Sequence, residues 1–287
     1  MTAADAPNAA QADYWNGRTG DTWTELNRLL DMELRPLGLE AQAALGPRPG
    51  ERVLDIGCGG GETSLDLAAA VAPGGAVLGV DISRPLLDLA ARRAEELGLQ
   101  VRFAVADAQT VDFRASDFGG GRFDAAFSRF GVMFFSDPTA AFANVLKALK
   151  PGGRLAFVCW RPATENPLMT APIEAARDLI PPSPPSDPLA PGPFAFADPE
   201  RVRKILGQAG FEAVAIRPFD ARVGGWTPDE ALVVAQRVGP LGAALRENPD
   251  LRPKVLDVVA RELERHQDAD GKVRMGAAVW IVTATAP

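Results

Sequence analysis

The chain has 287 residues, of which 47% are apolar and 23% are charged. This length suits one large α/β domain with insertions, and no apolar run is long enough to span a bilayer. The formal net charge of -7 provides no basic surface for nucleic acid or anionic membranes. Small-molecule partners are therefore favoured over nucleic acid.

The opening stretch MTAADAPNAAQAD is small and polar, without the basic and apolar regions of a signal peptide. It indicates a frayed tail and predicts a cytoplasmic protein with no integral membrane segment. The two cysteines, Cys58 and Cys159, predict neither a disulfide framework nor a metal site. The sequence does not choose between a monomer and a homodimer.

Short apolar runs alternate with helical patterns up to residue 160, which predicts a parallel sheet covered by helices on both faces. Two more strand-like runs close the chain, so seven strands are expected, at residues 52–56, 76–82, 101–106, 123–128, 154–160, 211–223 and 273–286. Ser83, Asp137 and Asp198 each precede a helical run and are the predicted N-caps.

Three segments interrupt this alternation and are predicted to form a helical cap over the active face. We expect an N-terminal helical lid at residues 1–45, a cofactor-binding core at 46–160 and a proline-rich cap insertion at 161–197. A core helix and strand at 198–223, a helical cap insertion at 224–270 and the last core strand at 271–287 follow. A disordered loop is the alternative for the proline-rich segment, but Met169, Phe194 and Phe196 favour burial.

The stretch DIGCGGGE, residues 55–62, follows the first predicted strand, where glycines let the backbone approach a ligand closely. Asp55 and Glu62 would place negative charge beside a pyrophosphate, which argues against a dinucleotide, and Asp55 would favour a cation. Asp81 ends the second strand, the position of an acid that binds ribose hydroxyls, and Asp107 ends the third, within reach of an adenine amino group. The predicted ligand has a cationic head, a ribose and an adenine.

At these residues the chain resembles the class I S-adenosylmethionine-dependent methyltransferases. VLDIGCGGGETS is similar to their glycine-rich first motif, GVDIS and VADAQ to the segments with the ribose and adenine acids, and LKPGGRLAFVCW to a later turn and strand. The resemblance is specific over residues 52–160 and implies a Rossmann-like, seven-stranded, mostly parallel sheet. YWNG, SRFGVMFFSDP and AFVCWR are most similar to the branch of ubiquinone and menaquinone biosynthesis and natural-product enzymes.

The resemblance implies that S-adenosyl-L-methionine is the cofactor and S-adenosyl-L-homocysteine the product. Carried over residue by residue, it implies contacts from Asp55, Gly57, Cys58 and Gly59 around the methionine part, Asp81 and Ile82 at the ribose, Asp107 and Ala108 at the adenine, and Ser128 and Arg129 beneath the cofactor.

The acceptor is expected to be a small, largely apolar molecule of the quinol, phenol or indole type, and methylation at carbon, oxygen or nitrogen stays open. Mostly aromatic side chains are the candidate contacts, with core packing as their alternative: Trp15, Trp23, Met133, Phe134, Trp160, Arg161, Asn166, Phe196 and Trp226.

Tyr14, the only tyrosine, is the candidate catalytic residue, because its hydroxyl could orient the acceptor; helix packing is the alternative. His266 stands in a polar stretch typical of the end of a surface helix and is not expected to act as a base. A sulfonium methyl is already electrophilic, so placing the nucleophile in line with it is expected to supply most of the catalysis.

Several other functions are considered. No paired acids suit the magnesium site of catechol-type enzymes, so transfer without a metal is expected. No Asp-Pro-Pro-Tyr-type element follows the fourth strand, and the acidic composition disfavours nucleic-acid acceptors. A noncatalytic protein that binds S-adenosylmethionine as a sensor or scaffold is the alternative function.

Overall fold

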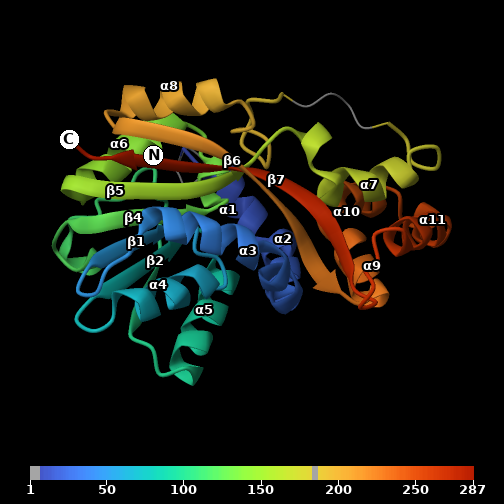
Figure 1. The fold of residues 1–287 in the computed structure, drawn as a ribbon, viewed down its shortest axis with the longest axis horizontal. Coiled ribbons are helices and arrows are strands. Elements are labelled where there is room, and N and C mark those ends of the chain that lie inside the picture. Colours follow the sequence, from blue (N-terminus) through green and yellow to red (C-terminus); the bar gives the residue numbers. More distant parts are fainter. Residues whose placement is uncertain (1–6, 183–186) are drawn as a thin grey trace.

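The computed structural model describes residues 7–182 and 187–287. At its centre is a seven-stranded sheet with the order β3-β2-β1-β4-β5-β7-β6 (Figure 1). The strands are β1 (Arg52–Ile56), β2 (Ala76–Asp81), β3 (Val101–Val105), β4 (Phe123–Arg129), β5 (Leu149–Trp160), β6 (Glu212–Trp226) and β7 (Val273–Thr285). The first five strands pair in parallel, and β7 is antiparallel to β5 and β6. The predicted Rossmann-like, mostly parallel sheet is confirmed.

The strand order reverses between β1 and β4, because the chain runs outward from β1 to β3 before it returns to β4. At such a point the loops that follow the two central strands diverge and leave a crevice at the carboxyl ends of the strands. The sheet thus places the glycine turn after β1 and the ends of β2, β3 and β4 around one site.

Helices cover both faces of the sheet (Figure 1). One face carries α3 (Asn27–Leu45), α4 (Glu62–Val71) and α5 (Arg84–Glu96), and the other carries α6 (Pro138–Ala148) and α8 (Pro199–Ala209). The predicted caps Asp137 and Asp198 are confirmed, since they accept hydrogen bonds of 2.9 Å from the amides of Ala140 and Glu200. Ser83 stands before α5 but its hydroxyl donates to the carbonyl of Trp15, at 2.8 Å, and caps nothing.

An aromatic cluster forms the core on the α6 face. Phe142 lies 5.5 Å from Phe157 and 6.2 Å from Phe196, measured between ring centroids. Phe196 is only 1% exposed, so the structure places this acceptor candidate in the core and not at a ligand cavity. The proline-rich segment is held to the sheet through this ring, although residues 183–186 lie outside the described part of the chain.

Four further helices gather at the far end of the long β6–β7 ladder (Figure 1). They are α7 (Pro167–Ala175), α9 (Pro228–Ala235), α10 (Gly239–Glu247) and α11 (Arg252–Glu264), and short 3-10 helices occur at Ser116–Phe118, Gly131–Phe134, Ala163–Glu165 and Pro249–Leu251. Helix α7 contacts α10 and α11, so the helices of the two insertions pack against one another. Thr227 and Glu230 form a capping box that starts α9.

The N-terminal helices α1 (Ala9–Asn16) and α2 (Arg18–Glu25) lie near the carboxyl edge of the sheet, and α2 contacts α5. The side chain of Asn16 donates to the carbonyl of Ile82, at 2.8 Å, and accepts from the amide of Arg84, at 2.9 Å. Residues 1–6 of the expected lid lie outside the described residues. None of the helices that the structure describes has the length and apolar character needed to cross a membrane.

Asn166 joins an insertion to the sheet, and this generates the first prediction. Its fully buried amide donates to the carbonyls of Arg161 and Pro162, at 3.1 and 3.2 Å, and accepts from the amide of Ala278, at 2.8 Å. Asn166→Ala removes the partners of the Arg161 carbonyl and of the buried Ala278 amide, so the free energy of unfolding should fall by about 1–3 kcal/mol, measured by urea denaturation. Asn248→Ala, at a helix end, is the control and should cost less; equal losses would contradict this structural role.

Candidate functional site

A cavity of about 1000 Å3, including its open mouth, lies at the point where the strand order reverses. Most of the predicted cofactor residues line it: Gly57, Cys58, Gly59, Asp81, Ile82, Asp107, Ala108 and Arg129. Three of the predicted acceptor residues, Trp15, Trp23 and Phe134, line it as well.

The glycine turn after β1 forms the floor of this cavity. Gly57 has a φ of +65°, and a Cβ atom on it would lie 2.7 Å from the Cα of Gly131, so only glycine fits. The amides of Gly57 and Cys58 donate to the carbonyl of Val80, at 2.8 and 3.1 Å, which ties the turn to β2. Burial raises the pKa of Cys58 well above its usual value, so the thiol that lines the cavity is neutral.

Asp81 lies at the end of β2 and holds the turn in place. One oxygen accepts from the amide of Gly59, at 2.8 Å, and the other from the amide of Ser83, at 2.9 Å. Burial raises the pKa of this carboxyl, while these amide hydrogen bonds oppose the rise. Because a carboxylate offers about four acceptor sites, each oxygen keeps capacity for a ligand hydroxyl.

Asp107 follows β3 and is already contacted by the N-terminal segment. Its Oδ1 accepts from Asn8 Nδ2, at 2.8 Å, and from the amide of Gln109, at 2.9 Å. The side-chain oxygen of Gln11 is buried in the same cavity and has no hydrogen-bond partner among the described residues. An unpartnered buried acceptor indicates a position for a ligand donor. Sequence reasoning missed Asn8 and Gln11, because they stand in a stretch that reads as a polar tail.

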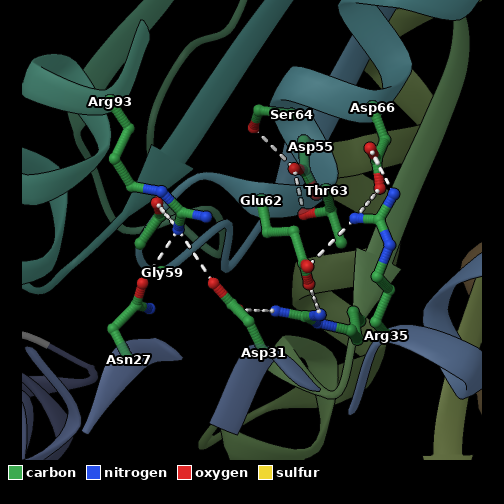
Figure 2. Close-up of polar contacts among 12 residues, drawn as sticks. Asn27, Asp31, Arg35, Asp55, Gly59, Glu62, Thr63, Ser64, Asp66 and Arg93 are labelled. Carbon is green, nitrogen blue, oxygen red and sulfur yellow. Dashed lines mark hydrogen bonds and ion pairs between the residues drawn. The ribbon is translucent and has the colours of Figure 1, made fainter. Parts of the chain in front are cut away.

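Asp55 does not line the cavity, contrary to expectation. It is fully buried, and its Oδ2 accepts from the hydroxyls of Thr63 and Ser64, both at 2.6 Å (Figure 2). Burial raises its pKa to about 6. The carboxyl therefore anchors the start of α4 and does not reach a ligand. Ser128 is similar: it is buried, lies outside the cavity lining and donates to the carbonyl of Ile56, at 2.7 Å.

A chain of ion pairs stands behind the glycine turn. The guanidinium of Arg129 pairs with Asp31 of α3, at 3.0 Å, and with Glu62 of α4. Arg35 pairs with Glu62, at 3.0 Å, and with Asp66, at 2.9 Å (Figure 2). Glu62 is thus neutralised by two arginines and lies outside the cavity lining.

Asp31 links this chain of ion pairs to the cavity. It lines the cavity and pairs with Arg93, at 2.9 Å, while Arg93 also donates to the carbonyl of Gly60, at 2.8 Å (Figure 2). Asp55 and Glu62 were expected to place negative charge beside the ligand, but neither residue lines the cavity. The acids that line the cavity are Asp31, Asp81 and Asp107.

The remaining candidates lie elsewhere. Tyr14 is 49% exposed, packs edge-on against Trp15 and does not line the cavity. Met133 is buried outside the lining, and Trp160 stacks at 4.4 Å on Phe130, which does line the cavity. Two polar candidates have other partners: Arg161 pairs with Glu165 and Asp220, and Asn166 binds backbone groups. His266, which was not expected to act as a base, lies 3.2 Å from Glu262.

A second cavity, of about 460 Å3, lies between α3, the four helices α7, α9, α10 and α11, and the ends of β6 and β7. Trp226, an acceptor candidate, lines it and donates to the carbonyl of Leu29, at 3.2 Å. Glu33 is the one ionisable residue in its lining. It is 8% exposed, and no hydrogen bond to its carboxyl is found in the described part of the chain. Burial raises its pKa to about 8, and the charge of Arg129 opposes the rise.

Residues 53–153 match a family of methyltransferase domains. Demethylmenaquinone methyltransferase of Thermus thermophilus is 40% identical over 48% of this chain and 60% of its own length, so less than two thirds of that relative is matched. Nocamycin O-methyltransferase of Saccharothrix syringae is 29% identical over 81% of this chain and 84% of its own length. The crystal structure of the cyclase SpnF has a TM-score of 0.55 at 21% identity, over 94% of this chain and 96% of its own, which shows likeness of fold.

No group of three or more His, Cys, Asp or Glu side chains within residues 7–182 and 187–287 is arranged to hold a metal ion.

Glu33 generates the second prediction. A free glutamate has a pKa of 4.5 and folded Glu33 one of about 8, so between these values the folded state keeps a proton that the unfolded state loses. The contribution of Glu33 to the free energy of unfolding is therefore complete below about pH 4.5. It is lost as the pH rises to about 8, by no more than about 1.4 kcal/mol per pH unit. Glu33→Gln should remove this part of the pH dependence in urea unfolding. Glu95→Gln, an exposed control, should keep it; parallel pH profiles for Glu33→Gln and the wild type would contradict the buried state of Glu33.

Proposed function

We propose that the chain is a class I S-adenosylmethionine-dependent methyltransferase, which transfers the methyl group of S-adenosyl-L-methionine to a small apolar acceptor. The observation that carries the proposal is the position of Asp81 and Asp107. These acids end neighbouring strands and line the same cavity as the glycine turn. This spacing matches a ribose followed by an adenine.

In this proposal Asp81 accepts hydrogen bonds from the two ribose hydroxyls, since its oxygens keep free acceptor capacity. The adenine lies between Ala108 and the N-terminal segment, with its amino group near Asp107 and the unpartnered oxygen of Gln11. Asn8 then shares Asp107 with the base. Helix α1 would thus be part of the nucleoside site as well as a cover over it.

The amino-acid end of the cofactor is proposed to lie over the glycine turn beside α3. Asp31 and Arg129 both line this part of the cavity and carry opposite charges. They suit the ammonium and the carboxylate of a methionine group, respectively. Since each already has a partner of opposite charge, the ligand would join an existing network and bury no isolated charge.

The bound cofactor supplies an electrophilic methyl group on a sulfonium. The chain contributes position and exclusion of water: Trp15 meets Trp23 and Phe134 edge to face, with ring centroids 5.5 and 5.4 Å apart, and all three line the cavity. Such rings also stabilise a cation by their negative faces. Holding the reactants in line can lower the barrier by about 7–11 kcal/mol. The proposal gives Tyr14 no part in the reaction, because the structure keeps it outside the cavity.

The acceptor class is inferred from the names of relatives and from the walls of the cavity. Two relatives are named as a demethylmenaquinone methyltransferase and a nocamycin O-methyltransferase, and the quinone in the first name favours an apolar acceptor with a ring. The aromatic walls of the cavity agree with this class. A quinol, phenol or indole is therefore proposed, and carbon, oxygen and nitrogen all stay possible as the methylated atom.

The third prediction concerns the cofactor. S-adenosylmethionine and S-adenosylhomocysteine should bind in calorimetric titrations, and NADH should not. Asp81→Ala should weaken both by about 1–3 kcal/mol, because the ribose loses charge-assisted hydrogen bonds. Asp112→Ala is the control, since Asp112 is an exposed acid in the loop after β3 and lies outside the cavity lining. Equal affinities for the two variants would remove Asp81 from the site.

Catalysis is tested separately from binding. Turnover of a panel of quinols, phenols and indoles with S-adenosylmethionine, followed by mass spectrometry, should give a product heavier by one methyl group. Tight cofactor binding without methylation of any compound, and without use of the cofactor, would favour the sensor or scaffold. The cyclase among the structural neighbours shows why this test is needed, since the fold occurs in a protein named for another reaction.

A further inference from the structure

The second cavity exists because both insertions fold over the sheet. Its walls are apolar and come from separate segments: Leu168 from α7, Val234 from α9, Leu241 from α10, Leu263 from α11 and Met275 from β7. Its volume of about 460 Å3 includes the open space at its mouth. The cap encloses a chamber of its own, distinct from the cavity that holds the acids of the cofactor site.

Glu33 is an ionisable side chain in a lining that is otherwise uncharged. A buried carboxyl normally has hydrogen-bond partners, and an apolar side chain of similar size would fill this position without the cost of removing a carboxyl from water. Within residues 7–182 and 187–287, however, no donor or acceptor contacts it. Its unused hydrogen-bonding capacity therefore faces the chamber.

The chamber also borders the cofactor site. Helix α3 contributes Leu30, Asp31 and Leu34 to the cofactor cavity and Glu33 to the chamber. Arg129 lines the cofactor cavity, and its charge acts on Glu33. A molecule in the chamber would lie one helix away from the bound cofactor.

We propose that this chamber is a separate binding site for a small, largely apolar molecule and that Glu33 recognises one uncharged oxygen of it, a ketone or quinone carbonyl. This site goes beyond the proposed methyl transfer, whose reactants meet in the first cavity. Around neutral pH the carboxyl is mostly protonated, because its pKa is about 8, and a protonated carboxyl donates one hydrogen bond. A carbonyl oxygen accepts that bond and buries no charge, which suits the apolar walls.

Three bicyclic probes of the same shape test this assignment: 1-tetralone, which has a ketone, tetralin, which has no polar atom, and 1-aminotetralin, which has an amine. Binding is followed through the fluorescence of Trp226, which lines the chamber, with S-adenosylhomocysteine present. Trp226→Phe retains the other four of the five tryptophans and should lose most of the signal. Wild-type protein should bind 1-tetralone about 2- to 10-fold more tightly than tetralin, which is the effect of one neutral hydrogen bond.

The variants separate recognition from packing. Glu33→Leu should bind 1-tetralone and tetralin equally, whereas Glu33→Gln keeps a donor and should retain the preference for the ketone. Glu95→Gln is the exposed control and should behave as the wild type. A ketone preference that survives in Glu33→Leu, a tighter binding of 1-aminotetralin, or no binding of any probe would overturn the inference.

Cofactor affinity distinguishes this failure from failure of the proposed function. The same samples are titrated with S-adenosylhomocysteine alone, and Glu33→Leu should bind it as the wild type does. If none of the proteins binds S-adenosylhomocysteine, the proposed function fails. If all bind it and the probes do not respond to Glu33, the inference about the chamber fails alone.

Discussion

The ion pairs of Arg129 are the constraint on which the site depends. This guanidinium at the end of β4 is enclosed between Asp31 of α3 and Glu62 of α4, so it joins three elements that are far apart in the sequence. A buried charge that loses one partner is strongly unfavourable, which holds all three elements in one arrangement. The glycine turn lies directly before α4, and the second cavity lies against α3. The shapes of both cavities therefore follow from where Arg129 holds these helices.

Helix α3 separates two chemical environments. One side carries Asp31 and faces a cavity with two more acids, Asp81 and Asp107, while the other carries Glu33 and faces apolar walls. A nucleoside with a charged amino-acid end suits the first environment, and a largely apolar molecule suits the second. The helices of the two insertions add the second environment to the sheet and its glycine turn.

The strands and the two strand-end acids could be predicted because their evidence is local: an apolar run, then a glycine or an acid. Asp55 shows the limit of such evidence, since the sequence does not tell which side of the turn its carboxylate faces. The hydroxyls of Thr63 and Ser64, in the first turn of α4, decide this. Asn8, Asp31 and Glu33 could not be found at all, because they lie in segments without a motif and reach the cavities only through the packing of α1 and α3.

Hydrogen exchange with and without S-adenosylhomocysteine tests most directly that the cofactor binds between the glycine turn and the N-terminal helices. Because α1 and α3 line the cavity with the turn, the ligand should slow exchange in residues 8–31 and 57–60 together and leave the outer strand β6 unchanged. Unchanged exchange in both segments, at a concentration of S-adenosylhomocysteine that saturates binding, would contradict the account.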